Sequence, residues 1–343
     1  MVSIKEISQI VGLSPTTVSN VVHGKKSKVS EINYRKVQAA LKEHNYVSNM
    51  GGRILGRHGS KIIGVILSYS RRSEINVFSD PFYDQIIGSL EEEIRKRGYF
   101  MMLYTSGSVN ESLQFVSAWN IEGLIILGAL PDDAGKLIQE RKTPLAFIDT
   151  YIDKKFETAD FINIGLKDFE GGYQITKYLL SLGHRKIGFC ADGVRLFGVD
   201  YERFAGFKQA LQEAGSQFDS NDFFGLDYQL EPRHAFLKEL AKNQLKNFTA
   251  LVFTSDYLAV DAMNIFQDNG IRVPQDLSVT GFDHNVFSEQ CRPKLTTIGQ
   301  NVRQKAVLAI DHLFKRIKHE GKAVKVNQLL DVELVVQDST KKR

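Results

Sequence analysis

The chain has 343 residues, of which 43% are hydrophobic and 24% are charged, and its formal net charge is +4 at pH 7. No apolar run approaches the ~20 residues of a membrane-spanning helix, and residues 1–20 lack the continuous apolar core of a signal peptide. The only two cysteines, Cys190 and Cys291, are far apart in sequence and lack metal-ligand spacing. We therefore expect a cytoplasmic protein with reduced thiols, no metal site and no cofactor.

The positive charge is concentrated at one end of the chain. Residues 1–61 carry ten lysines and arginines against three glutamates, whereas the remaining residues carry more acids than bases. A basic end attracts phosphate groups and makes binding depend on salt, so this asymmetry indicates a nucleic-acid partner.

The first predicted helix begins after Ser3. Ser3 and Glu6 have the spacing of a capping box, in which each side chain accepts a hydrogen bond from the other residue's amide. Ile7 and Val11 then fall on one helical face, and Gly12 permits a tight exit from the helix. These signals predict a short amphipathic helix that ends in a turn.

A second short helix follows, with Ser14 as its N-cap and Pro15 at its first position. Its outward positions are Pro15, Thr16, Thr17 and Asn20. Asparagine can pair with both polar groups of an adenine edge, and threonine can contact a thymine methyl. The two helices therefore predict a helix-turn-helix that reads the DNA major groove. The alternative is an ordinary helical hairpin whose threonines and asparagine are solvated.

From residue 61 onward, short apolar runs alternate with amphipathic segments, a pattern that predicts parallel sheets covered by helices. The predicted strands are Ile62–Leu67, Tyr99–Tyr104, Leu124–Leu127, Leu145–Ile148, Ile187–Phe189, Ala250–Phe253 and Leu277–Thr280. The predicted helices are Tyr83–Arg97, 110–119, 132–141, Gly172–Leu182, Arg203–Ala214 and Tyr257–Asn269. Two such blocks of about 100–130 residues fit two α/β domains.

The chain resembles the LacI/GalR family of bacterial transcription regulators over essentially its whole length. The motifs that carry the resemblance are Gly12–Ser19, Val29-Ser30, Asn45-Tyr46, Asp80–Tyr83, Ile121–Ile125, Gly183–Ile187, Arg203–Phe207 and Gly270–Asp283. The resemblance implies an α/β fold class, with an all-α helix-turn-helix head and a periplasmic-binding-protein-like core of two doubly wound, parallel-sheet subdomains.

The same resemblance implies a discontinuous core. The expected divisions are a head at 1–47, a hinge at 48–60, a proximal subdomain at 61–160 and 292–322, and a distal subdomain at 161–291 and 323–343. The final strand, near Gln328–Val336, is expected in the distal subdomain. The polar tail Ser339–Arg343 is expected to fray.

In the hinge, the resemblance implies a short helix that forms only on DNA. Leu55 matches an apolar wedge that opens a base step in the minor groove, and Arg53 would lie against phosphate. Gly51 and Gly52 depart from the family pattern and weaken a helix by about 1 kcal/mol each. The alternative is a flexible linker in which Leu55 only covers apolar surface.

The resemblance also implies an effector cleft between the subdomains. A carboxylate, an arginine and aromatic rings suit a polyhydroxylated sugar. The alternative for Phe82 and Tyr83 is packing within the core, and for Asp149 it is a turn or cap. Asp256 is expected to cap a helix. The loop between Leu67 and Pro81 is longer than is usual in the family. The residues matched to the ligand are Phe82, Tyr83, Asp149, Arg203, Tyr228, Ser255 and Asp283.

Together these observations predict a homodimeric repressor that binds a pseudo-palindromic operator on double-stranded DNA. A small effector, expected to be a sugar or sugar phosphate, would control its DNA affinity allosterically. A purine-type corepressor or a phosphoprotein partner are alternatives within the same fold. The alternative of a different class is a ligand-binding module without DNA binding. The sequence contains no hydrolase, metalloprotease, dinucleotide or phosphate-loop motif, so we expect no enzyme.

Overall fold

A computed structural model describes residues 2–46, 59–68, 77–156, 159–216, 218–320 and 325–343. The chain divides into two compact units, Met1–Ser60 and Lys61–Arg343, which are described separately here. The division falls where the predicted hinge ends. Within the residues described, no helix combines the length and apolarity that crossing a membrane would require.

The described residues of the first unit form a head of three α-helices. Its helices are α1 (Ile4–Val11), α2 (Pro15–Val22) and α3 (Glu31–Glu43), with a short 3-10 turn, η1, at Lys26–Lys28. The capping box is present, since the Glu6 amide donates to the Ser3 hydroxyl and the Ser3 amide donates to the Glu6 carboxylate. Gly12 has the left-handed φ of 65° that the turn requires. The helices enclose a small core of Ile7, Val11, Val18, Val21, Val37 and Ala40.

The second unit contains two six-stranded sheets. The first has the strand order β11-β5-β4-β3-β1-β2 and is parallel throughout. Its strands are β1 (Ile62–Ser68), β2 (Phe100–Ser106), β3 (Gly123–Leu127), β4 (Leu145–Ile148), β5 (Ile162–Leu166) and β11 (Val326–Leu330). Nearly all residues of β1, β3, β4 and β5 are buried, as parallel strands covered on both faces should be.

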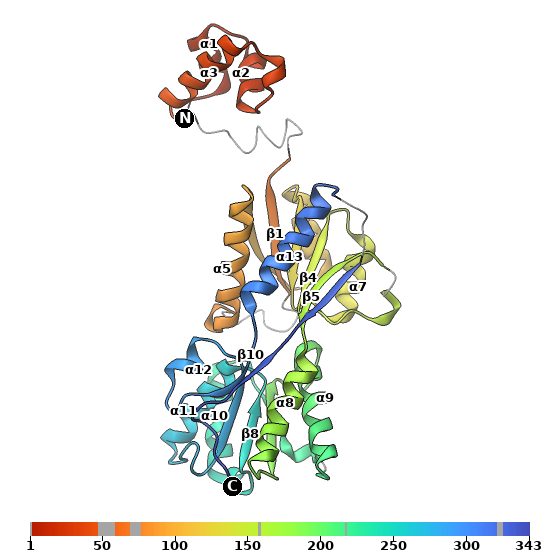
Figure 1. The fold of residues 1–343 in the computed structure, drawn as a ribbon, viewed down its shortest axis with the longest axis vertical. Coiled ribbons are helices and arrows are strands. Elements are labelled where there is room, and N and C mark those ends of the chain that lie inside the picture. The colour runs from red at the N-terminus through yellow and green to blue at the C-terminus, as the bar shows by residue number, and fades with distance from the viewer. Residues whose placement is uncertain (1, 47–58, 69–76, 157–158, 217, 321–324) are drawn as a thin grey trace. The chain divides into compact units, whose positions relative to one another are not determined.

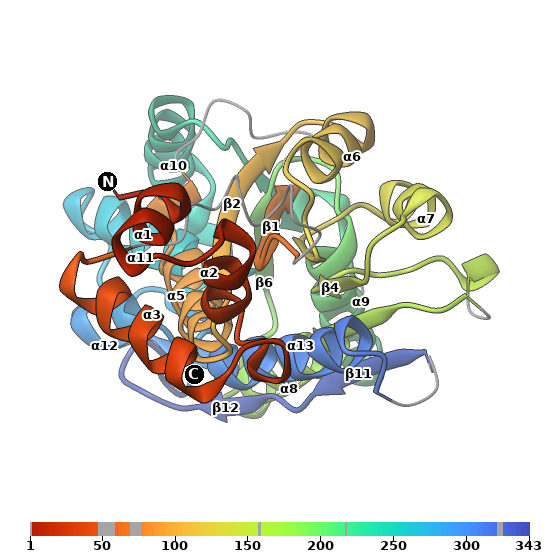
Figure 2. The same cartoon turned by 90° about the horizontal axis from the view of Figure 1, so that it is seen from above.

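Four helices cover the first sheet. Helices α5 (Pro81–Lys96) and α13 (Val302–Ile317) lie side by side and share one apolar core with alternate residues of β1 (Figure 1). Helices α6 (Val109–Ala118) and α7 (Pro131–Glu140) lie on the opposite side of the strands from α13 (Figure 2). This doubly wound arrangement leaves the carboxyl ends of the strands open to a ligand.

The second sheet has the order β12-β10-β9-β8-β6-β7, and only β12 at its edge is antiparallel. Its strands are β6 (Ile187–Asp192), β7 (Phe223–Leu226), β8 (Ala250–Phe253), β9 (Ser278–Asp283), β10 (Thr296–Gly299) and β12 (Glu333–Val335). Its helices are α8 (Asp168–Ser181), α9 (Gly198–Glu213), α10 (Leu230–Asn243), α11 (Asp256–Asp268) and α12 (Val286–Gln290). Both expected parallel-sheet subdomains are therefore present.

Helices α8 and α9 approach each other at two glycines. A Cβ atom on Gly172 would lie 2.0 Å from the Arg203 carbonyl oxygen, and one on Gly206 would lie 2.0 Å from the Phe169 carbonyl oxygen. No side chain larger than hydrogen fits there, because both obstacles are backbone atoms. This close contact fixes α9, and with it Arg203.

The crossings between the sheets differ from the predicted boundaries. Strands β5 and β11 belong to the first sheet, and β10 belongs to the second. The crossings therefore lie near residues 167, 300 and 331, not at 161, 292 and 323. The predicted single strand Gln328–Val336 is in fact the end of β11 followed by β12. The prediction was wrong because an apolar run does not identify which sheet it joins.

The C-terminal tail does not fray. The Ser339 hydroxyl is buried and donates to the Val279 carbonyl at 2.6 Å, and the Arg343 amide donates to the Leu182 carbonyl at 2.8 Å. Polar composition indicated an unattached tail, but long-range backbone contacts hold it on the second sheet.

Candidate ligand cleft and nucleic-acid interface

The second helix of the head presents small polar groups at its N-terminal end. Pro15 and Thr16 are exposed, and Thr17 and Asn20 are half-buried. The Ser14 hydroxyl accepts from the Thr17 amide at 3.1 Å and lies 2.9 Å from the Thr17 hydroxyl. Thr17 therefore helps to cap α2 as well as facing outward. The predicted hinge residues Arg53 and Leu55 lie outside the described residues, as does most of the long loop before Pro81.

In the second unit, the carboxyl ends of the two sheets line one cavity of about 120 Å³. Polar groups gather where parallel strands end, which is where α/β sheets receive ligands. Six of the seven predicted effector residues line it: Phe82, Tyr83, Asp149, Arg203, Ser255 and Asp283.

The seventh predicted residue, Tyr228, lines an adjoining cavity of about 160 Å³ that it shares with Tyr83 and Asp149. Its hydroxyl lies 3.4 Å from the Asp192 carbonyl. We refer to the two adjoining cavities together as the cleft. Tyr228 therefore lines the part of the cleft whose lining does not include Arg203 or Asp283.

On the first-sheet side, the cleft is built around Asp149 and Lys305. Asp149 directly follows β4 and has a left-handed φ of 54°, a strained conformation typical of functional sites. The Lys305 side chain, 1% exposed, places its Nζ 2.8 Å from each Asp149 carboxylate oxygen and 2.7 Å from Gln300 Oε1. All three donors of this ammonium are therefore used. Phe82 lies beside it, with the Nζ 5.4 Å from the ring centroid.

The sequence analysis did not identify Lys305 as part of the site. A lysine in an amphipathic helix is ordinarily solvated, and nothing in its neighbourhood in the chain signals burial. Its partner Asp149 is 156 positions away. Only the tertiary fold brings the two together.

On the second-sheet side, Arg203 is buried within α9, which begins at Gly198 and not at the arginine itself as predicted. Its Nε donates to Asp168 at 2.8 Å, its Nη1 donates to the Thr254 carbonyl at 2.5 Å, and its guanidinium lies 3.6 Å from the Phe282 ring centroid. Burial is the largest single influence and opposes the charge, but Asp168, Asp283 and Asp200 together outweigh it and raise the pKa of Arg203. The arginine therefore stays cationic.

A pair of buried carboxyl groups lies next to the arginine. Burial, together with the nearby Asp256 carboxyl, raises the pKa of Asp283 well above its usual range. Burial likewise raises the pKa of Asp256 to about 6, although hydrogen bonds from Thr297 and Asn285 oppose the shift. The low-dielectric surroundings thus favour protons on this pair.

The cap of α11 is Ser255, not Asp256 as predicted. The Ser255 hydroxyl accepts from the Leu258 amide at 3.2 Å and caps α11. Asp256, predicted as that cap, instead accepts from the Asn285 amide at 2.9 Å. Ser255 lines the cleft while acting as a cap.

Gln300 connects the two sides of the cleft. Its Oε1 accepts from Lys305, and its Nε2 donates to Asp283 Oδ1 at 2.6 Å. Gln300 belongs to the crossing between β10 and α13. A single side chain of the crossing therefore contacts a buried group on each side, Lys305 on one and Asp283 on the other.

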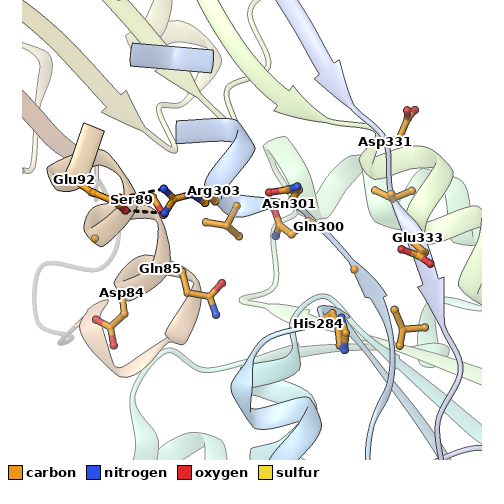
Figure 3. A pocket seen from close by; sticks show the side chains of 15 residues that line it. Asp84, Gln85, Ser89, Glu92, His284, Gln300, Asn301, Arg303, Asp331 and Glu333 are labelled. Carbon is orange, nitrogen blue, oxygen red and sulfur yellow. Dashed lines mark hydrogen bonds and ion pairs between the residues drawn. The ribbon is translucent and has the colours of Figure 1, made fainter. Parts of the chain in front are cut away.

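A further cavity of about 690 Å³ lies along the crossings, between α5 and the segment that contains β12. Figure 3 shows Arg303 paired with Glu92, while His284 and Glu333 line another side of this cavity. None of the seven predicted effector residues lines it, whereas Gln300 lines both this cavity and the cleft. No group of three or more potential metal ligands occurs among the residues described.

Comparisons with known proteins agree with a helix-turn-helix head and a two-sheet, ligand-binding core. Residues 3–49 match the family described as bacterial regulatory proteins, lacI family, and residues 176–340 match the periplasmic binding protein-like domain. The HTH-type transcriptional repressor PurR of Pasteurella multocida is 30% identical, with 100% of each chain covered. The HTH-type transcriptional regulator MalR of Clostridium butyricum is 28% identical, with 98% of each covered.

Solved structures show the same architecture. A lac repressor dimer bound to operator and the anti-inducer ONPF is 26% identical, with a TM-score of 0.82 and 99% of each chain covered. The complex of the regulator CelR with cellobiose is 23% identical, with a TM-score of 0.71 and 99% and 100% covered, and supports the fold alone.

A helix-turn-helix head joined to a two-sheet core with a polar cleft defines a ligand-controlled DNA-binding regulator. The full-length relatives identify it further. The chain belongs to the lacI family of bacterial regulatory proteins, and it is a DNA-binding transcriptional repressor with a ligand-binding core.

Proposed function

We propose that the protein binds a pseudo-palindromic operator as a homodimer through Pro15, Thr16, Thr17 and Asn20. The observation that supports this is the exposed polar start of α2, stabilised by the Ser14 cap. Two copies of such a helix read two half-sites when they are spaced by whole turns of DNA. Arg53 and Leu55 are proposed to act in the minor groove.

We further propose a carbohydrate effector, bound in the cleft. The cavity of about 120 Å³ gathers one guanidinium, five carboxyl groups and two aromatic rings. Carboxyl oxygens accept from sugar hydroxyls, the guanidinium donates to them, and a ring covers the apolar face of a sugar. The convergence of these groups in one cavity is the observation that supports the proposal.

Effector binding would then alter the crossings that Gln300 links, and so change operator affinity. Such control requires the effector to bind the DNA-bound and free states with different affinity. As a DNA-binding repressor, the protein is proposed to work in the cytoplasm.

A purine-type corepressor is the second candidate. Flat bases stack on aromatic rings, and Phe82 and Tyr83 form an edge-to-face pair at the cleft, with ring centroids 5.2 Å apart. Several relatives at 28–30% identity carry the name PurR. A sugar would release the operator, whereas this ligand would tighten binding to it.

The test of DNA binding compares the full chain with residues 61–343 alone. Sequences selected from a random duplex pool should bind the full chain, with a log–log salt slope of about −0.9 per phosphate contact. The truncated chain should lose this binding. If it keeps the same affinity and slope, the head is not the DNA-binding surface.

The effector test uses the selected duplex. Panels of neutral sugars, sugar phosphates and purine bases are screened for a thermal shift, since a ligand of the native state stabilises by mass action. Ligands that shift melting are then titrated against the operator complex. Arg203→Met should abolish the response, while the exposed-site control Lys318→Met should retain it. A response that survives Arg203→Met would place the effector elsewhere.

A further inference from the structure

A third cavity adjoins the cleft on its second-sheet side. It has a volume of about 560 Å³ and lies at the carboxyl ends of β6 and β7, beside the start of α10. Tyr228 and Arg195 line both this cavity and the cleft, so the two spaces share a boundary. We refer to the third space as the β7 cavity. Its other lining residues include Gly193, Val194, Gly225, Pro232 and Phe236.

Close backbone contacts fix the boundary between the two spaces. A Cβ atom on Gly225 would lie 2.7 Å from the Gly193 carbonyl oxygen, so the segment after β6 lies directly on the end of β7. Gly193 itself has a left-handed φ of 74°, and a Cβ atom on it would lie 2.9 Å from the Tyr228 hydroxyl oxygen. The edge of the Tyr228 ring therefore packs on backbone, and the ring is held in place before a ligand arrives.

The β7 cavity combines apolar surface with hydrogen-bonding groups. Val194 is 83% exposed, and Phe236 is half-buried. The Asp227 carboxylate accepts from the Gln229 amide at 2.8 Å, which fixes its direction. Among the residues that the structure describes, Arg195 has neither a hydrogen-bond nor an ion-pair partner, so its N–H groups can donate to a ligand. Aromatic and apolar surface with a few placed polar groups is the pattern that binds sugar rings.

The sizes of the cavities favour a ligand that extends beyond the cleft. The two cavities of the cleft measure about 120 and 160 Å³, whereas the β7 cavity measures about 560 Å³. Ligand sites commonly span about 300–1,000 Å³. A ligand confined to the cleft would leave the largest of the three adjoining spaces unfilled and the ring of Phe236 uncovered.

We propose that the effector is an oligosaccharide, whose first unit binds in the cleft and whose next unit passes Tyr228 into the β7 cavity. This inference rests on the proposed function, because it takes the effector to be a carbohydrate bound in the cleft. Phe236 is assigned as the surface on which the second unit stacks, and Arg195 as a donor to its hydroxyls. Selectivity for the length of the sugar therefore resides outside the cleft.

The experiment compares sugars of different length. Glucose, galactose, mannose, fructose and xylose are titrated into the full chain by calorimetry, together with di- and trisaccharides built from them. At least one disaccharide should bind about tenfold or more tightly than its component monosaccharides, because the second unit adds a ring contact and hydrogen bonds. Monosaccharide binding as tight as that of every longer sugar would overturn the inference.

Variants of Phe236 test the assigned surface. Phe236→Leu keeps apolar volume beside the core but removes the ring, so it should weaken disaccharide binding about three- to tenfold and leave monosaccharide binding unchanged. Phe236→Tyr keeps the ring and should retain the preference of the wild type. The control Phe100→Leu changes a phenylalanine that is 58% exposed on β2 and lines none of the three cavities. Equal losses for both sugars in Phe236→Leu would show a structural role and overturn the assignment.

Failure of this inference and failure of the proposed function give different results. If monosaccharides bind and longer sugars bind no more tightly, the carbohydrate effector stands and the β7 cavity is not a subsite. If no sugar of the panel binds, the carbohydrate effector fails, and this inference fails with it. Neither result bears on operator binding by the head, which is tested with the truncated chain.

Discussion

The two sides of the cleft neutralise their carboxyl groups in different ways. On the first-sheet side, Asp149 is paired with the buried ammonium of Lys305. On the second-sheet side, Asp283 and Asp256 crowd together, and burial raises the pKa of both. On the first side, the negative charge is balanced by a cation from α13, a helix that is distant in the sequence. On the second side, the carboxyl groups are neutralised by protons taken from the solvent.

The difference is informative because the two acids occupy similar positions. Asp149 follows β4, and Asp283 ends β9, so each lies at the carboxyl end of a parallel strand. Both have positive φ, 54° and 128°. Equivalent backbone sites can thus hold a carboxyl group in either charge state. We therefore expect protein stability to depend on one residue, Lys305, at the first side and on pH at the second side.

The largest expected effect comes from Lys305→Met. The substitution keeps most of the side-chain volume but leaves the Asp149 carboxylate, which is only 14% exposed, without its cation. Removing one partner of a buried ion pair costs about 3–5 kcal/mol. Denaturant unfolding should show this loss of stability, with the slope of the transition unchanged.

A double variant separates charge from packing. Adding Asp149→Asn to Lys305→Met removes the unpaired charge and should restore a large part of the lost stability. If the double variant is as unstable as the single one, the cost arises from packing around Phe82, and the proposed importance of the ion pair is wrong.

The second prediction concerns pH. Below about pH 4, Asp256 is protonated in both the folded and the unfolded state and does not contribute. Between about pH 4 and 6, the unfolded chain releases this proton while the folded chain retains it, so stability falls as pH rises. Relative to Asp256→Asn, the wild type should lose up to about 3 kcal/mol across this window.

The comparison with Asp256→Asn is necessary because other acids have the opposite effect. Hydrogen bonds from Lys294 and His284 lower the pKa of Glu289 to about 2, so Glu289 adds stability as pH rises. Unfolding curves at several pH values, measured for both proteins, isolate the difference. Parallel curves from pH 4 to 7 would show that Asp256 is ionised in the folded protein.

Much of the head could be predicted because its signals are local. Ser3, Glu6, Gly12 and Ser14 act on residues within four positions, and the structure shows the caps and the turn that they predicted. The alternation of strands and helices in the core could also be predicted from the sequence. Apolar periodicity is a property of a short window of sequence, so it survives without knowledge of the fold.

The sheet memberships and the pairing of cleft residues could not be predicted, because they depend on contacts between segments that are far apart in the sequence. Strand β5 was not predicted, and neither were the sheet memberships of β10 and β11, because pairing partners lie far away in the chain. The pairing of Lys305 with Asp149 likewise gives no local signal. Six of the residues that family resemblance matched to the ligand line one cavity, but the resemblance did not reveal which groups neutralise the charged ones.

The smallest expected effect comes from Gln300→Met, which cuts the link between the two sides while leaving both intact. The substitution removes a hydrogen bond from Lys305 and one to Asp283. Because each bond involves a polar or charged partner that stays buried, we expect a stability loss of about 1–2 kcal/mol. The matched control is Gln304→Met, an exposed neighbour near the start of α13.

The decisive readout is coupling, measured as the change in operator affinity produced by a saturating effector. If Gln300 transmits cleft occupancy to the crossing, its variant should bind effector yet shift operator affinity less than the control does. An unchanged shift would mean that Gln300 does not transmit occupancy of the cleft to the crossing.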